Sequence, residues 1–187
     1  MIPNLTAILI GFSLICSPSG DTEHDANFDK KAMEQADGYD TPDSFRSDLE
    51  SALQIYLELT DALVEEHTDH AAAQAGEFSQ AISEISVDAL DESAADFWKE
   101  YSGKIEDHAS ALQEYEDIED QRHEFEYISE ALIEVVKVKG PLDMTLYQQR
   151  CPMVGDDEGD WLSNHEEIRN PYHGESMLNC GDTVEEL

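Results

Sequence analysis

Sulfur side chains stand at both ends of one segment near the carboxyl end of the chain. Cys151 and Met153 are two positions apart, and Met177 and Cys180 are three apart. Thiolates and thioethers are ligands that Cu(I) and other soft cations prefer, whereas carboxylates suit Mg²⁺, Ca²⁺ and Mn²⁺. The four sulfurs therefore predict a soft-metal site, and His173, four positions before Met177, is a candidate nitrogen ligand.

The spacing within each pair allows both sulfurs to point at one ion. Positions i and i+2 of an extended segment face the same side, and positions i and i+3 of a helical turn share a face. The pattern is not that of a standard zinc site, because Cys-x2-Cys pairs and His-x3-His are both absent. We expect copper, as Cu(I), or another soft metal ion as the cofactor.

The same two cysteines support a second interpretation, in which they form a disulfide. An even pair of thiols in an exported protein is commonly oxidised. A bond from Cys151 to Cys180 would close a loop of about 30 residues and stabilise the fold by about 3 to 4 kcal/mol. The chain would then be a metal-independent module that docks on an envelope partner, with its methionines as core filler. A reducible pair could bind metal only when open, so the two interpretations are compatible.

An apolar run near the start of the chain predicts export. Residues 5–15, LTAILIGFSLI, are too few to span a bilayer but suit the core of a signal peptide. Ser13-Leu14-Ile15-Cys16 resembles the lipobox of bacterial lipoproteins, in which the cysteine is lipidated. We expect a signal or lipoprotein segment at 1–16 with lipid on Cys16, a flexible tether at 17–41 and a folded domain at 42–187. The expected location is the cell envelope, as a periplasmic or outer-membrane lipoprotein; simple secretion and an uncleaved anchor are the alternatives.

The charge balance excludes some partners. The chain has 44 acidic and 10 basic side chains and a formal net charge of −34. Nucleic acid and anionic membrane surfaces are therefore unsuitable, membrane contact is expected only through the lipid anchor, and cations are the natural partners. We interpret the acidic surface as halophilic, because salt screens such a dense coat of carboxylates. Unfolding curves in dilute and in concentrated salt test this interpretation.

Apolar residues recur at intervals of three and four through most of the chain, which is typical of amphipathic helices. The predicted helices run from Pro42 to about Glu66, from Thr68 or Asp69 to Ile85, from Ala94 to Leu112 and from about Glu116 to Val136. Gly140-Pro141 ends the last of them. After a short extended run at 144–148, glycines and Asn170-Pro171 favour turns. The predicted fold is all-α, an up-and-down four-helix bundle with a C-terminal turn-rich lobe that carries the cysteines and methionines.

Four large side chains are expected to fasten this lobe to the bundle. Trp161 and Tyr172 should pack as aromatic anchors, and Arg122 and Arg169 should bind carboxylates or loop carbonyls. No catalytic arrangement is evident, since a cysteine paired with His165 or His173 matches no local signature. We therefore expect a protein that is not an enzyme.

The runs LYQQRCPM (146–153) and WLSNHEEIRNPYHGESMLNCG (161–181) resemble the carboxy-terminal signature of a bacterial domain family of unknown function. Further matches, which extend the resemblance over residues 42–187, are Tyr56-Leu57, Asp61 to Val64, Trp98, Gln121-Arg122, Phe125 and Ser129. The family occurs alone in small exported proteins and fused to periplasmic adaptors of copper and heavy-metal efflux systems.

The resemblance implies a helical domain that handles copper or a related metal. Cys151, Met153, Met177 and Cys180 match the sulfur positions of the family, whereas His173 stands where the family often has an aromatic residue. The resemblance also implies an efflux-system adaptor protein as a partner. Together with the sulfur chemistry it predicts an exported protein that buffers Cu(I) or hands it to an efflux system.

Overall fold

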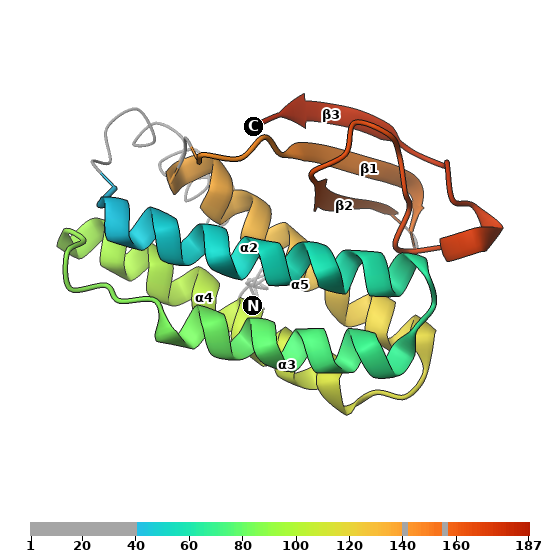
Figure 1. The fold of residues 1–187 in the computed structure, drawn as a ribbon, viewed down its shortest axis with the longest axis horizontal. Coiled ribbons are helices and arrows are strands. Elements are labelled where there is room, and N and C mark those ends of the chain that lie inside the picture. The colour runs from blue at the N-terminus through green and yellow to red at the C-terminus, as the bar shows by residue number, and fades with distance from the viewer. Residues whose placement is uncertain (1–40, 140–141, 155–156) are drawn as a thin grey trace, which may run out of the picture.

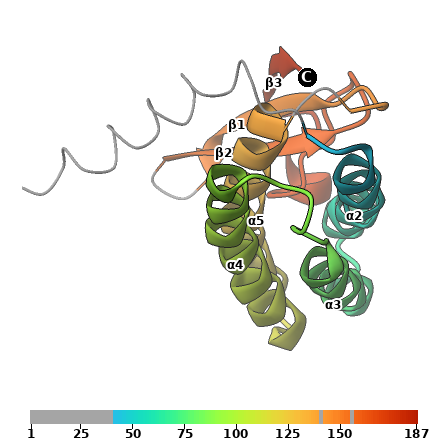
Figure 2. The same ribbon diagram turned by 90° about the vertical axis from the view of Figure 1, so that its left-hand side faces the viewer.

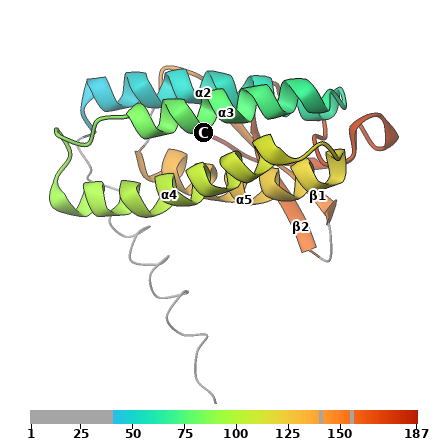
Figure 3. The same ribbon diagram turned by 90° about the horizontal axis from the view of Figure 1, so that it is seen from below.

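Four helices form most of the computed structural model, which describes residues 41–139, 142–154 and 157–187. They are α2 (Asp43–Val64), α3 (Thr68–Glu84), α4 (Glu92–Glu114) and α5 (Ile118–Lys139). Consecutive helices run in opposite directions and pack side by side (Figures 1 and 3). The four predicted helices are therefore confirmed. The predicted signal segment with Cys16, and the tether up to residue 40, lie outside the described residues.

A side-chain cap begins α4, and an apolar stripe turns α2 toward the core. Asp91 caps α4 by accepting a 2.8 Å hydrogen bond from the Ala94 N–H, which satisfies one of the free donors at a helix start. The apolar stripe of α2 is buried, with Leu49, Leu53 and Tyr56 at 0 % exposure. No helix of the described segments combines the length and the apolar character that a bilayer crossing requires.

The C-terminal lobe contains a three-stranded antiparallel sheet, which corrects the all-α prediction. Its strands are β1 (Tyr147–Val154), β2 (Asp157–Ser163) and β3 (Asp182–Glu186), in the order β2-β1-β3. β2 packs against α5 and also contacts α2. Figures 1 and 2 show the sheet on the α2 and α5 side of the bundle, with α3 on the opposite side. The fold is mostly helical with a small sheet.

Strand β1 is difficult to predict from the sequence, because some of its residues are buried on each face of the sheet. Gln148 and Gln149 are neighbours in the strand, so they point to opposite faces, yet they are only 3 % and 0 % exposed. A strand covered on both sides loses the alternation of polar and apolar residues that identifies a half-exposed strand. Pro152 also argues against a strand in the sequence. The strand accommodates it where the register shifts between Cys151 and Val154.

The Tyr56 hydroxyl joins the bundle to the sheet. It accepts a 3.2 Å hydrogen bond from the Leu162 N–H of β2 and shares a 2.8 Å hydrogen bond with the Ser129 hydroxyl of α5. Burial raises the pKa of Tyr56 to about 12, despite the opposing effect of these hydrogen bonds. The phenol therefore stays neutral at physiological pH and holds α2, α5 and β2 together.

Candidate functional site

The structure brings the two distant cysteines together. Cys151 lies in β1, and Cys180 lies two residues before β3, the strand that pairs with β1 through Arg150 and Asp182. Gly181, the residue after Cys180, lies so close to β1 that an added Cβ would be 2.6 Å from the carbonyl oxygen of Arg150, the residue before Cys151. The Cys151 thiol is also near enough to raise the pKa of the Cys180 thiol. Both are free thiols. We call these two residues the thiol pair.

The two members of the thiol pair differ in their access to solvent. Cys151 is 0 % exposed, whereas Cys180 is partly exposed. Desolvation raises the pKa of the Cys180 thiol, and the neighbouring Cys151 and the Asp182 carboxylate raise it further. Without a cation Cys180 is therefore a protonated thiol at neutral pH. A bound soft cation would reverse this, because a coordinating thiol loses its proton.

The segment 164–181, which connects β2 to β3 and which we call the sulfur loop, is organised by Asn170. This residue is 0 % exposed. Its N–H donates to the Leu178 carbonyl at 2.8 Å, and its Nδ2 donates to the Cys180 carbonyl at 2.9 Å. Its Oδ1 accepts from the Tyr172 N–H at 2.9 Å, and its carbonyl accepts from the Gly174 N–H at 3.1 Å. Asn170 therefore fixes the position of Cys180. This role was not predicted from the sequence, in which Asn170-Pro171 indicated only a turn.

Gly181 allows the sulfur loop to approach β1 closely. Its φ is +141°, and a Cβ at this position would lie 2.6 Å from the Arg150 carbonyl oxygen. Any other residue would therefore be strained and would collide with the backbone next to Cys151. A glycine directly after Cys180 is the sequence signal that could have indicated this approach.

Met177 shares a turn with Cys180. The Cys180 N–H donates a 2.9 Å hydrogen bond to the Met177 carbonyl. The turn follows η2 (Gly174–Ser176), and Met177 itself is partly buried. The backbone between these two sulfur residues is therefore a turn.

Met153 lies differently from the prediction. The bulge in β1 leaves Met153 56 % exposed while Cys151 is fully buried, because an extra residue in one strand breaks the alternation of faces. His173 is adjacent, and its Nε2 donates a 2.8 Å hydrogen bond to the Met153 carbonyl. A carbonyl can only accept, so Nε2 carries the proton and the Nδ1 of neutral His173 is left to act as a ligand.

The structure offers few other ligands near the thiol pair. His165 is exposed, and its carbonyl accepts hydrogen bonds from Gln149 and Ser163. Within the described residues no three side chains of His, Cys, Asp or Glu are grouped so that they could hold a metal ion. A metal bound by the thiol pair would therefore have to take its third protein ligand from another residue type, and a methionine thioether suits a soft cation.

The four predicted anchors of the lobe are in place. The Arg122 Nε donates a 2.9 Å hydrogen bond to the Pro171 carbonyl, and Arg169 forms an ion pair with Asp61. The ring of Tyr172 contacts Trp161 edge to face, with centroids 5.9 Å apart, and Phe125 of α5 on the other side, at 5.6 Å. These contacts hold the sulfur loop against the bundle.

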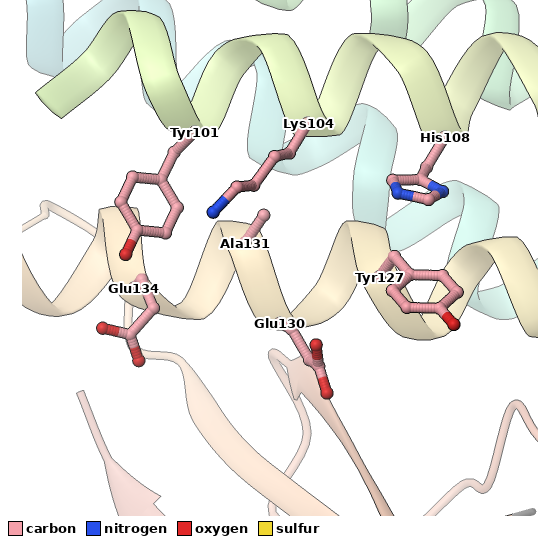
Figure 4. A pocket seen from close by; sticks show the side chains of 7 residues that line it. All are labelled: Tyr101, Lys104, His108, Tyr127, Glu130, Ala131 and Glu134. Carbon is pink, nitrogen blue, oxygen red and sulfur yellow. The ribbon is translucent and has the colours of Figure 1, made fainter. Parts of the chain in front are cut away.

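A separate groove of about 390 Å³ lies between α4 and α5. Tyr101, Lys104 and His108 of α4 face Tyr127 and Glu130 of α5 across it (Figure 4). His108 stacks on the Tyr127 ring, with centroids 4.5 Å apart. No cysteine or methionine lines this groove, so it offers no sulfur ligand to a soft cation.

Comparison with known proteins supports part of the resemblance. Residues 52–143 match the model of a family described as a protein of unknown function, DUF3347. No curated protein and no solved structure matches the chain. The matched range begins in α2 and ends before β1, so it contains most of the bundle and none of the four sulfur residues.

Proposed function

We propose that the chain is an exported soft-metal-binding protein that holds Cu(I), or a similar thiophilic cation, at the thiol pair. The observation that supports this most directly is the proximity of Cys151 and Cys180, which come from positions far apart in the sequence but lie on segments that adjoin at Arg150, Gly181 and Asp182. Thiolates are the protein ligands with the highest preference for such cations. The surrounding net charge of −34 favours cations over anions as ligands.

Further ligands would come from the sulfur loop and the β1 bulge. Met177 is in the same turn as Cys180, and in this proposal its thioether supplies the third sulfur ligand. Met153 is exposed, and the His173 imidazole is hydrogen-bonded to its carbonyl. Met153 and His173 would act as exchangeable outer ligands, with the cysteines as the permanent ones. His173 would have to move toward the thiol pair, because it is not grouped with the two cysteines in the described structure.

The unequal exposure of the thiol pair suits a carrier that gives up its metal to another protein. A partner sulfur can reach a cation on the side of Cys180, while the buried Cys151 keeps its hold until the new bond has formed. Ligands are then replaced one at a time, which avoids a free metal ion. In this proposal the protein works in the cell envelope, and it buffers Cu(I) or passes it to the adaptor of an efflux system.

An anaerobic titration of the reduced full-length protein with Cu(I), in competition with a chelator of known affinity, tests the proposal. We expect one tightly bound ion, strong loss of affinity in Cys151→Ser and in Cys180→Ser, and a smaller loss in Met177→Leu. Cys16→Ser is the matched control, because it removes a thiol outside the proposed site and should leave the affinity unchanged. Binding that survives the loss of both Cys151 and Cys180 would refute the proposal.

The proximity of Cys151 and Cys180 also favours one alternative function. If Cys151 and Cys180 form a permanent disulfide, the lobe is a stapled surface of a metal-independent interaction module in the envelope. Mass analysis of the exported protein under non-reducing conditions separates the two functions. A disulfide that resists mild reductants favours the module, and an accessible dithiol favours the carrier.

A further inference from the structure

The thiol pair is arranged so that solvent reaches one sulfur and not the other. Cys180 is partly exposed and Cys151 is 0 % exposed. The two residues lie on adjoining segments, because Arg150 pairs with Asp182 and an added Cβ on Gly181 would be 2.6 Å from the Arg150 carbonyl oxygen. A reagent that arrives from solution therefore meets Cys180 first. A covalent bond that the reagent forms with the Cys180 sulfur is then close to the buried Cys151 thiol.

We propose that the thiol pair undergoes ordered exchange with disulfides, in which Cys180 attacks and Cys151 resolves. The partner is a low-molecular-weight aliphatic disulfide, R–S–S–R. Cys180 first gives up its proton to solvent, and the small thiolate fraction attacks one of the sulfur atoms of the disulfide. The S–S bond breaks, and one R–S⁻ leaves and takes up a proton to become R–SH. The Cys151 thiolate then attacks the Cys180 sulfur of the mixed disulfide, and the second R–SH leaves. Two electrons and two protons pass from the thiol pair to the reagent, and an internal disulfide remains.

The sulfur loop favours the second step, because it keeps Cys180 beside Cys151. The Asn170 Nδ2 holds the Cys180 carbonyl, the Met177 carbonyl holds the Cys180 N–H, and Gly181 brings the chain against Arg150. A mixed disulfide at Cys180 is therefore held close to the resolving thiol. Such positioning favours internal attack over attack by a second external thiol.

The exchange would also control the metal site. A disulfide has no thiolate to offer, so oxidation removes both cysteine ligands at once and reduction restores them. This step rests on the proposed function, whereas the exchange itself does not.

The test uses the full-length protein with Cys16→Ser, glutathione disulfide as the reagent, and mass spectrometry as the readout. With both Cys151 and Cys180 present we expect an internal disulfide, seen as the loss of two hydrogens. Cys151→Ser should trap one glutathione on Cys180. Cys180→Ser should react at Cys151 at least about tenfold more slowly, because a fully buried thiol reacts only when the fold opens. Both single variants should react alike in denaturant, which shows that the difference belongs to the fold.

Equal reaction of the two single variants in the folded state would overturn the proposed order. Accumulation of a mixed disulfide in the protein with both thiols would overturn the resolving role of Cys151. A Cu(I) titration of the oxidised and re-reduced protein separates this inference from the proposed function. Ordered exchange without Cu(I) binding by the reduced form would refute the metal function alone, and Cu(I) binding without disulfide formation would refute the exchange alone.

Discussion

The Asn170 side chain holds the backbone of Cys180 through a 2.9 Å hydrogen bond from Nδ2 to the carbonyl oxygen. The next residue along the chain, Pro171, accepts a 2.9 Å hydrogen bond from Arg122 of α5. The position of the exposed thiol is thus tied to the helical bundle through two consecutive residues of the sulfur loop. Changes at this connection should affect the thiol pair without touching a sulfur atom.

Asn170→Asp should loosen the sulfur loop. The substitution keeps the shape of the side chain but replaces the Nδ2 donor with an oxygen that faces the Cys180 carbonyl, so a buried hydrogen bond is lost at a cost of about 1 to 3 kcal/mol. We expect slower formation of the Cys151–Cys180 disulfide and a lower midpoint of chemical unfolding. Asn164→Asp is the control, because Asn164 is exposed in the same loop. An unchanged disulfide rate in Asn170→Asp would contradict the positioning role.

Gly181→Ala and Gly103→Ala should change stability in opposite directions. The Gly181 φ of +141° and the 2.6 Å approach of its added Cβ to the Arg150 carbonyl oxygen predict a loss of about 1 to 3 kcal/mol. Gly103 lies within α4, and nothing is within 4 Å of its added Cβ. Alanine should stabilise the helix there by up to about 1 kcal/mol. Urea unfolding measures the free energy of unfolding of both variants. An unchanged free energy in Gly181→Ala would show that the loop can move away from β1.

Tyr56→Phe should destabilise the protein, because it leaves the Leu162 N–H without its acceptor and removes the partner of the Ser129 hydroxyl. The expected cost is about 1 to 3 kcal/mol. The variant should also change the response to alkali. The folded-state pKa of Tyr56 is about 12 and the ordinary value is 10.0, so its contribution is full below pH 10 and is lost as the pH rises toward 12. Stability curves against pH should therefore fall less steeply over this range in Tyr56→Phe than in the wild type.

Arg122→Lys should weaken the docking of the sulfur loop on the bundle. The buried guanidinium donates to the carbonyls of Pro171 and Leu63 and pairs with Glu119, a set that one ammonium group cannot reproduce. We expect a loss of about 1 to 3 kcal/mol in thermal or chemical unfolding. Lys104→Gln removes a solvent-exposed ion pair with Glu100 and should cost no more than about 0.5 kcal/mol. Similar losses in both variants would argue against the anchoring role of Arg122.

The affinity for Cu(I) should rise with pH until it passes the raised pKa of Cys180. The metal binds the thiolate, so a proton must leave before or during binding, and this costs less as the pH increases. The ionisable groups that raise this pKa, beyond desolvation, are Cys151 of β1 and Asp182 of β3. Competition titrations at several pH values measure the slope, after correction for the chelator. Cys180→Ser should reduce the slope, and Asp182→Asn should move the rise to lower pH.

The sequence alone determined the bundle, and it supplied the residue types on which the proposed site rests. Helices α2 to α5 follow from an apolar repeat of three and four, which is a local pattern that a single helix satisfies by itself. The anchoring roles of Trp161, Tyr172, Arg122 and Arg169 could also be predicted, because large aromatic groups seek burial and arginine seeks several acceptors. The preference of thiolate and thioether for soft cations is likewise a property of the residue types.

The tertiary structure alone decided where those sulfurs lie. β1 pairs with strands on both sides, and its neighbouring residues Gln148 and Gln149 are both buried although they point to opposite faces, so its pattern cannot be read from one segment. The bulge that exposes Met153 depends on the register of β1 with β2. The proximity of Cys151 and Cys180 depends on Asn170, Gly181 and the pairing of β1 with β3. All of these features depend on residues that are distant in the chain. The spacing of residues along a sequence indicates only local structure, so it could not predict them.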